Sequence, residues 1–460
     1  MAWRKLGMRY TFKRCTKIGL QATSLILLYL IPGMLVLESA HASDASPLKL
    51  TLRDAVQMAL KQNPQVQISN LEFAQSEQDK KIARSSLLPT LGATVAETAV
   101  RSNFEAFTGK PIPGIPKQIG PFQTFQGGGA FSMPLFDLTL WRQLQASNYA
   151  MSATAAQSQT TREQTTLLVV SQYLGCQRAA ADIKAAQSRV ELAETLYTLA
   201  ASLQENGVGT GIDTLRANVQ LQNEKQRLMV AETESKTGIY GLAHLLNIDP
   251  EQKIELVDTI SFFETPVTDV DRLLDQAYKA RPELRAIEAR QQALRKQRQA
   301  ASAARLPSIL AQGMWSYYGL SIPNSIPTYQ YQVSVSAPLF TGGRISAEVA
   351  KIDLELKKLD QEMQELRNVI ALQAKVSAAQ LEAARNEVEV ANLGLKLANE
   401  TVSQARDRFE AGVANNVEVV TAQDDLARAN DNQINALYKY NQARADMARA
   451  FGQIEMLYSK

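Results

Sequence analysis

The sequence predicts a mainly α-helical protein with a small β part, built from two tandem repeats. Each repeat is expected to hold a strand pair followed by a long coiled-coil helical hairpin. Three observations predict this fold. Proline-containing motifs recur in the same order in both halves, two proline-free segments are far longer than an ordinary helix, and a glycine turn followed by an acid occurs twice.

The first 42 residues have the pattern of a secretory signal peptide. Six basic residues precede an apolar run from Leu20 to Leu37, and the small-x-small motif Ala40-His41-Ala42 follows. A membrane anchor is the alternative interpretation of this run, which is short and interrupted by Pro32. Removing the six basic residues and one acid of this segment from totals of 49 and 46 leaves 43 and 45. The charge balance therefore does not indicate nucleic-acid binding.

The two repeats follow the signal segment and are colinear. Pro64 aligns with Pro282, 218 residues apart, whereas Pro134 aligns with Pro338, 204 residues apart. The first repeat therefore carries a longer insert between these two points. The repeats are expected at 43–267 and 268–460.

Each repeat is expected to open with two helices. Thr51-x-x-Asp54 and Thr268-x-x-Asp271 have the pattern of capping boxes ahead of apolar runs. A second helical stretch should follow each proline, at about 64–88 and 282–306.

Strands are expected next, at about 90–136 and 308–340. Tyr329–Ser336 alternates apolar and polar residues, which is the period of a half-exposed strand, and Ile309–Tyr318 is its expected partner. In the first repeat, Thr90–Val100 and Phe125–Met133 should play these parts. The loop between them, FEAFTGKPIPGIPKQIGPF, is longer than its counterpart, GLSIPNSIPT.

Helical hairpins are expected at about 138–247 and 344–456. The segment 138–205 alone has 68 residues without proline, or about 100 Å of helix at ~1.5 Å per residue. Apolar residues step by four and three along both hairpins, as in coiled-coil seams. These are Leu192, Leu196, Leu199 and Leu203, and Leu359, Met363, Leu366 and Ile370.

The number of strands and the apolar seams on the helices predict that one copy of the chain does not form the functional structure alone. No segment after the signal peptide has 18 uninterrupted apolar residues, so any membrane-spanning part must be made of strands. Four strands cannot close a barrel, and open sheet edges are not tolerated in lipid. Strands that enter a membrane would therefore have to be pooled between copies.

Several motifs together resemble the TolC-type outer-membrane efflux proteins. They are LTLRDAVQMALKQNP near the start, PLF at two strand ends, PLFTGGR, and RFEAGVANNVEVVTAQ. The resemblance covers nearly all of the chain after the signal peptide. It implies a homotrimer with a 12-strand β-barrel in the outer membrane, joined to a 12-helix α-barrel in the periplasm of a Gram-negative-type bacterium.

The function implied by this resemblance is that of a passive exit duct for efflux or type I secretion. Its partners would be a periplasmic membrane-fusion adaptor, an inner-membrane transporter and outer-membrane lipid, with no nucleic acid and no cofactor. A secreted periplasmic coiled-coil scaffold or adaptor that forms no pore is the alternative. It accounts for the helices but not for alternating strands in both halves. The sequence names neither the cargo nor the pump.

The resemblance also assigns roles to the two glycine turns. Asp213 and Glu418 match acids that line the periplasmic entrance; the alternative is that they only stabilise the first turns of their helices. The turns would form the adaptor-docking tips, through Gly207, Val208, Gly209, Gly211, Gly412, Val413, Asn415 and Asn416. Phe409, Ala414 and Thr421 stand where the best known member has a tyrosine, an arginine and a second acid, so its latch is not expected here.

Two further expectations concern the strands and catalysis. Trp315, Tyr317, Tyr329 and Tyr331 are interpreted either as an aromatic girdle at the membrane interface or as ordinary sheet packing. After the signal peptide, His244 is the remaining histidine and Cys176 the remaining cysteine, so the chain holds neither a catalytic triad nor a set of metal-ligating Cys and His residues. The protein is not expected to be an enzyme.

Overall fold

The computed structural model describes residues 47–259, 262, 270–411, 413–414 and 416–459. The signal peptide expected at 1–42 and the capping residue expected at Thr268 lie outside these ranges. In chain order, the elements are β1 (Leu48–Leu50), α1 (Leu52–Gln62), α2 (Pro64–Ser85), β2 (Thr90–Asn103), α3 (Phe104–Thr108), β3 (Gln118–Phe136), α4 (Leu138–Glu205), α5 (Gly211–Leu246), β4 (Ile254–Leu256), α6 (Val270–Ala280), α7 (Pro282–Ala303), β5 (Ser308–Gly319), η1 (Ile322–Asn324), β6 (Ile326–Ser336), α8 (Arg344–Glu410), α9 (Asn416–Ala450) and α10 (Ile454–Ser459).

The lengths of the helices confirm the duplication predicted from the sequence. α1 and α6 have 11 residues each, and α2 and α7 have 22 each. α4 and α8 have 68 and 67 residues, and α5 and α9 have 36 and 35. The two halves therefore have the same helical plan.

Local sequence signals explain where the first helices begin. The capping box predicted at Thr51 and Asp54 is present, since each side chain bonds the backbone N–H of the other residue. Pro64 and Pro282 occupy the first positions of α2 and α7, where the absent N–H costs no helical hydrogen bond. Both prolines therefore separate a short helix from a longer one.

The four main strands form one antiparallel sheet in the order β2-β3-β5-β6. The first strand pair is longer than the sequence indicated, because β2 runs to Asn103 and β3 begins at Gln118. Part of the expected loop, from Gln118 to Phe122, is thus strand. The rest of that loop holds α3, which was not predicted.

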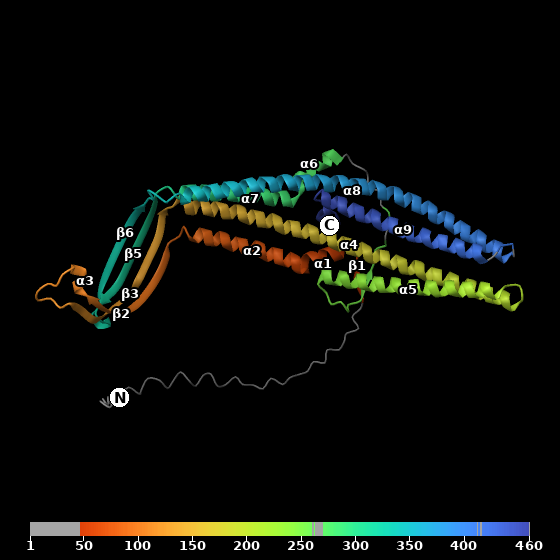
Figure 1. Cartoon of the computed structure of the whole chain (residues 1–460), viewed down its shortest axis with the longest axis horizontal. Coiled ribbons are helices and arrows are strands. Elements are labelled where there is room, and N and C mark those ends of the chain that lie inside the picture. The colour runs from red at the N-terminus through yellow and green to blue at the C-terminus, as the bar shows by residue number, and fades with distance from the viewer. Residues whose placement is uncertain (1–46, 260–261, 263–269, 412, 415, 460) are drawn as a thin grey trace, which may run out of the picture. The chain divides into compact units, whose positions relative to one another are not determined.

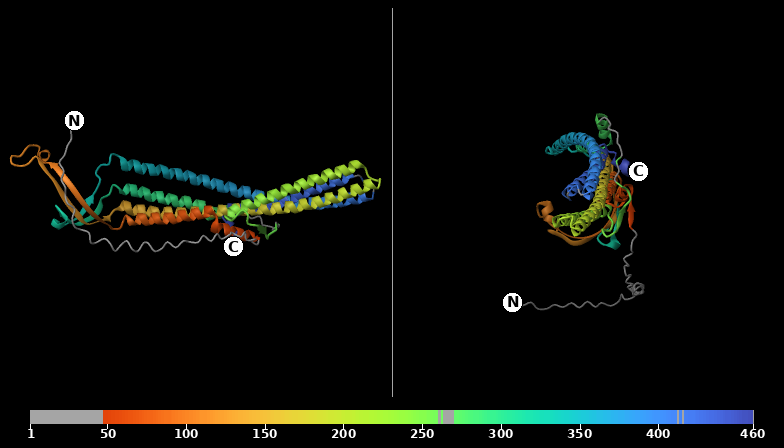
Figure 2. Two further views of the ribbon diagram at one scale, coloured as in Figure 1. Left: turned by 90° about the horizontal axis from the view of Figure 1, so that it is seen from below. Right: turned by 90° about the vertical axis from the view of Figure 1, so that its right-hand side faces the viewer.

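The helices repeat the order of the strands (Figure 1). α2 packs on α4, α4 on α7, and α7 on α8; nearer the hairpin tips, α5 packs on α4, α4 on α9, and α9 on α8. Figure 2 shows the same neighbours from a second direction. Each of the four strands is continuous in the chain with one helix: α2 leads into β2, β3 into α4, α7 into β5 and β6 into α8. The sheet and the helices therefore end at the same two edges. One edge is formed by β2, α2 and α5, and the other by β6 and α8.

A buried core lies where α1 and the small parallel pair β1–β4 pack on α4 and α5. Tyr173 is fully buried there and donates its hydroxyl proton to the carbonyl oxygen of Leu50 at 2.9 Å. Cys176 belongs to this core, and burial raises the pKa of its thiol to about 11. The packed structural thiol expected from the sequence is therefore present.

Candidate functional site

The first hairpin tip is a tight reversal that requires glycine. Gly207 has φ of +74°, a left-handed conformation that side chains disfavour. The N–H groups of Val208 and Gly209 both donate to the carbonyl oxygen of Leu203, at 2.9 and 2.8 Å. A Cβ atom on Gly209 would lie 3.0 Å from the backbone nitrogen of Gln204, so this glycine is needed for close approach.

Asp213 lies in the first turn of α5, directly after this reversal. Its side chain accepts a hydrogen bond from the Thr210 hydroxyl, and its backbone N–H donates to the Thr210 carbonyl oxygen at 3.0 Å. The residue therefore stabilises the start of the helix. Gly211 begins the helix, and Val208 is exposed at the tip.

The second tip is described in part. Gly412 and Asn415 lie outside the described residues, whereas Val413 is exposed and Asn416 begins α9. The Val413 N–H donates to the Arg408 carbonyl oxygen at 3.0 Å. Glu418 lies in the first turn of α9, matching Asp213 in the first repeat.

Glu418 forms an ion pair that the sequence interpretation missed. Its Oε1 atom lies 3.0 Å from Nε of Arg408, in the last turn of α8. The available signal was a basic residue in the last turn of one helix and an acid in the first turn of the next. Arg408 and Glu418 are 10 residues apart in the sequence. This signal therefore identifies an ion pair only when the geometry of the hairpin is known.

The two tips belong to one packed region. Leu196 of α4 packs with Ala405 of α8 and with Val419 and Ala422 of α9, and Phe409 packs against this cluster. Thr421 donates its hydroxyl proton to the Val417 carbonyl oxygen within its own helix, at 2.8 Å. Phe409 thus serves apolar packing.

The sheet has one mainly apolar face, which carries Glu97 near its loop end, and one face that is uncharged across its central rows. Directly paired residues share a face, so Leu91, Phe131 and Tyr331 line up on one side, as do Trp315 and Tyr329. The four aromatic residues singled out in the sequence lie on this face and are exposed. Trp315 and Tyr317 pack edge to face with ring centroids 5.3 Å apart, and Tyr329 and Tyr331 lie 5.7 Å apart.

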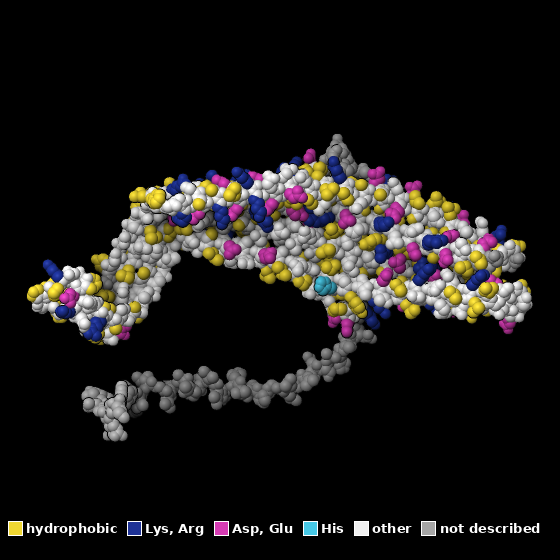
Figure 3. Space-filling view, in the orientation of Figure 1, with side chains coloured by type: hydrophobic (Ala, Val, Ile, Leu, Met, Phe, Trp, Pro, Cys, Tyr) yellow, Lys and Arg dark blue, Asp and Glu magenta, His cyan; other side chains and the backbone are white. Residues whose placement is uncertain are grey.

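Across its central four rows, the opposite face carries no charged residue among the described strands. Its members are Thr, Ser, Gln, Gly, Ala, Met, Tyr and Ile, with rows such as Thr90, Ser132, Gln312 and Gln332. Figure 3 shows charged side chains along the helices and at the loop end of the sheet, with apolar and uncharged ones between. Among the described residues, no helix is long and apolar enough to span a membrane.

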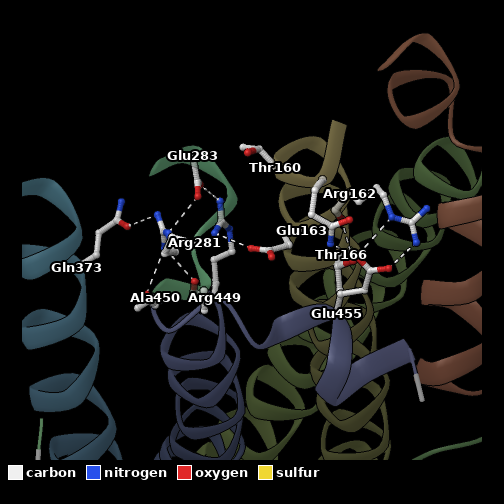
Figure 4. A network of polar contacts seen from close by, with 12 residues as sticks. Thr160, Arg162, Glu163, Thr166, Arg281, Glu283, Gln373, Arg449, Ala450 and Glu455 are labelled. Carbon is white, nitrogen blue, oxygen red and sulfur yellow. Dashed lines mark hydrogen bonds and ion pairs between the residues drawn. The ribbon is translucent and has the colours of Figure 1, made fainter. Parts of the chain in front are cut away.

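A buried ionic network joins the two repeats near the middle of the helices (Figure 4). Nη1 of Arg449 lies 2.9 Å from Oε2 of Glu163, and Nη2 of Arg449 contacts Glu283. Nε of Arg281 lies 3.2 Å from Glu283, and its Nη1 donates to the Arg449 carbonyl oxygen at 2.9 Å. These residues come from α4, α7 and α9 and from the residue that precedes α7. The network therefore links α4 of the first hairpin to α9 of the second.

The two carboxylates of this network have opposite pKa shifts. Burial raises the pKa of Glu163, and the Arg449 guanidinium compensates only in part. Burial acts in the same direction on Glu283, but Arg449 and Arg281 outweigh it and hold the pKa of Glu283 below its usual value. The ionised form of Glu283 is therefore stabilised by its arginine partners, whereas Glu163 takes up a proton at a higher pH than Glu283 does.

In the part of the chain that the structure describes, no group of three or more His, Cys, Asp or Glu residues is arranged to hold a metal ion. His244 is exposed near the end of α5. The candidate functional features of the described residues are therefore the two hairpin tips, the open sheet with two different faces, and the buried ionic network between the repeats.

The comparisons with known proteins agree with this geometry. No curated protein matches the chain in sequence. The fold is shared with the CmeC outer membrane channel of Campylobacter jejuni, at 17% identity and TM-score 0.77 over 88% of this chain and 86% of that one. It is also shared with the open-state MtrE outer membrane channel of Neisseria gonorrhoeae, at 18% identity and TM-score 0.74 over 88% and 89%. VceC of Vibrio cholerae matches at 15% identity and TM-score 0.74 over 87% and 96%.

A family model identifies the chain more directly than these distant structures do. The model described as "outer membrane efflux protein" matches residues 55–247 and 273–453, one segment in each repeat. The family is one of channels of the outer membrane rather than of enzymes. The chain belongs to the outer membrane efflux protein family.

Proposed function

We propose that three copies of the chain form a continuous pore that carries cargo, without chemical change, across the outer membrane. The observation that carries this proposal is the open four-stranded sheet with one exposed, mainly apolar face and one face that is uncharged across its central rows. Unpaired sheet edges are not tolerated in lipid, so β2 of one copy would pair with β6 of the next. Two copies would supply eight strands and three would supply twelve; the number three comes from the family resemblance.

The dimensions of the apolar face suit a bilayer. On β5 this face runs from Ile309 to Tyr317, which is about 26 Å along the strand at ~3.3 Å per residue. Membrane barrels carry an apolar band of about 25 Å. Trp315, Tyr317, Tyr329 and Tyr331 would face lipid. Tyr317 lies at one end of this span and would belong to an interfacial girdle, whereas Tyr331 pairs with Gly313 at its middle. The Thr, Ser and Gln side chains would line the water-filled interior.

The hairpin tips would be the entrance and the docking site for a periplasmic adaptor, which links the duct to an inner-membrane transporter. Asp213 and Glu418 would each bring one carboxylate per copy to this entrance. The sheet is at the opposite ends of α4 and α8, so the tips are the far ends of the proposed pore (Figure 1).

A matched pair of substitutions on neighbouring residues tests the membrane assignment. Val333→Arg puts a charge on the apolar face, where it should cost about 2–4 kcal/mol per copy near the bilayer centre and prevent assembly. Gln332→Arg puts the same charge on the polar face and should assemble normally. The readouts are the heat-modifiable oligomer on gels of unheated membranes and conductance in planar bilayers.

Equal behaviour of the two variants would contradict the membrane assignment. A wild-type protein that fractionates as a water-soluble monomer without conductance would instead favour the periplasmic scaffold.

A further inference from the structure

The internal duplication shows which helices cover each face of the long helices. Equivalent residues of the two hairpins are 205 positions apart: Asn247 and Gly452, which follow α5 and α9, both have positive φ, of 52° and 68°. Equivalent residues of α2 and α7 are 218 positions apart, as Pro64 and Pro282 are. A contact in one repeat can therefore be compared, residue by residue, with its counterpart in the other.

Within the chain, α4 of the first repeat packs on α7 of the second. α4 runs away from the sheet and α7 runs toward it, and Glu163 and Glu283 meet at Arg449. On such antiparallel helices, Thr160 and Ala286 lie one turn nearer the sheet and are level with each other. Small buried residues continue this row toward the sheet at intervals of seven, and they let the two helices approach closely. They are Ala146 and Ala153 on α4, and Ala293 and Ala300 on α7.

α8 is the counterpart of α4, but the equivalent face of α8 is exposed. The buried residues Thr160 and Glu163 correspond to Glu365 and Asn368, which are both exposed. α8 contacts α6, α7 and α9, which are the counterparts of α1, α2 and α5 on α4. In the described part of the chain, no helix packs on α8 in the way that α7 and α9 pack on α4.

α2 and α5, the counterparts of α7 and α9, have exposed residues where the second repeat has buried ones. Ile68 is 47% exposed, whereas its counterpart Ala286 is 2% exposed. Ile82 is 64% exposed, whereas its counterpart Ala300 is 4% exposed. His244 of α5 is exposed and corresponds to buried Arg449. Single exposed isoleucines are ordinary, but both of these stand at positions that the second repeat uses for helix packing.

We propose that a second copy of the chain covers the exposed face of α8 with its α2 and α5, so that Asn368 of one copy meets His244 of the next. The occupant is a second copy because α8 and β6 form one edge of the chain, whereas α2, α5 and β2 form the other. This inference rests on the proposed function, in which β2 and β6 of neighbouring copies pair. α8 then has the same neighbours as α4, and the next copy supplies two of them.

The contact between copies has different chemistry from the contact within the chain. A neutral imidazole offers one hydrogen-bond donor and one acceptor, and an amide offers both, so His244 and Asn368 are complementary. Glu365 brings a carboxylate one turn before Asn368, where α4 has Thr160. The four residues of the ionic network are replaced by side chains without a permanent charge. Glu163, Arg281, Glu283 and Arg449 correspond to Asn368, Asn63, Gln65 and His244, respectively.

One of these replacements keeps the same structural task. Arg281 donates from Nη1 to the Ala450 carbonyl oxygen at 3.4 Å, at the end of α9. Its counterpart Asn63 donates from Nδ2 to the Leu245 carbonyl oxygen at 2.8 Å, at the end of α5. The two repeats are therefore built alike at this level, which supports the use of one as a template for the neighbours of the other.

The test is cross-linking of the Asn368→Cys, His244→Cys double variant by a short bis-maleimide in native membranes. Both positions are exposed in the single chain, and native Cys176 is buried in the core. On denaturing gels after heating, most of the monomer band should shift to two and three linked copies. Each single variant should stay monomeric. Co-expressed chains that carry one substitution each should give two linked copies and no more, because each chain then makes a single link.

A second cysteine pair tests the register of the helices. Glu365→Cys with Ile68→Cys should also link the copies, because their counterparts Thr160 and Ala286 are level on α4 and α7. Glu365→Cys with Ile82→Cys is the matched control. Ile82 lies 14 residues from Ile68 on α2, or about 21 Å of helix at ~1.5 Å per residue, so this pair should not link.

The outcomes distinguish this inference from the proposed function. A heat-modifiable, conducting oligomer in which neither expected pair links would overturn the assigned contact and leave the pore intact. Equal linking by the Ile82 control would overturn the register. A wild type that is a water-soluble monomer would overturn the pore itself. Should the His244→Cys variant fail to assemble, the pair at Glu365 and Ile68 carries the test.

Discussion

Replacing Arg449 with methionine should destabilise the protein more than any change at a surface ion pair. Arg449 is 9% exposed, and its partners Glu163 and Glu283 are 5% and 16% exposed. Removing one partner of a buried pair costs about 3–5 kcal/mol, because the remaining charge stays buried without compensation. Arg281 still pairs with Glu283, so the loss should concentrate on Glu163.

The assay is the thermal or denaturant midpoint of the helical circular dichroism signal for purified oligomer in detergent. Adding Glu163→Gln to the Arg449→Met variant removes the orphaned charge and should recover at least half of the lost stability. Arg298→Met breaks an exposed pair with Asp353 and should leave the midpoint unchanged.

This reasoning would be refuted by an Arg449→Met variant within about 1 kcal/mol of the wild type, since loss of a buried partner costs more than that. It would also be refuted if Glu163→Gln gave no recovery. Either result would mean that water or a neighbouring group already neutralises Glu163.

Three further results are expected. The folded-state pKa of Glu163 is raised above its ordinary value of 4.5, so its contribution to stability is lost as pH rises through that raised value. The stability of Glu163→Gln relative to wild type should therefore increase as pH rises above about 4.5, and denaturant titrations at several pH values measure this; a constant difference would contradict the shift. Gly128→Val should disturb the pairing of β3 with β5 and reduce oligomer yield, because a Cβ atom would lie 2.3 Å from the Trp315 carbonyl oxygen. Gly207→Val should lower the free energy of unfolding by about 1–2 kcal/mol, because valine disfavours the left-handed φ of this position, and it should weaken cross-linking to the adaptor. The control Gly394→Ala, in open space on α8, should do neither. Normal cross-linking of the Gly207→Val variant would count against docking at the tip.

Local patterns in the sequence predicted much of the fold. The segment 138–205 lacks proline and was expected to be a single helix, and α4 has those bounds. The alternation in Tyr329–Ser336 likewise falls within β6. Both features depend on residues that are neighbours in the chain, where period and breaker residues act directly. The small strands β1 and β4 were missed, because three residues are too few to show a period.

The candidate site was predictable only in part. The Gly207 turn and the first-turn acids Asp213 and Glu418 were found, since a glycine reversal and an acidic helix start are local signals. Arg408 was not assigned, because its partner depends on how the two helices pack across the turn.

The sequence by itself determined the duplication, the type and approximate length of the long helices, the order of the four main strands, and the position of both reversals. Tertiary structure decided which charges meet: Glu163 and Arg449 are 286 residues apart, and neither is marked by any local pattern. The physical reason is that periodicity and turn chemistry act within a few residues. The pairing of buried charges is fixed only when packed helices bring distant segments into one place with low dielectric.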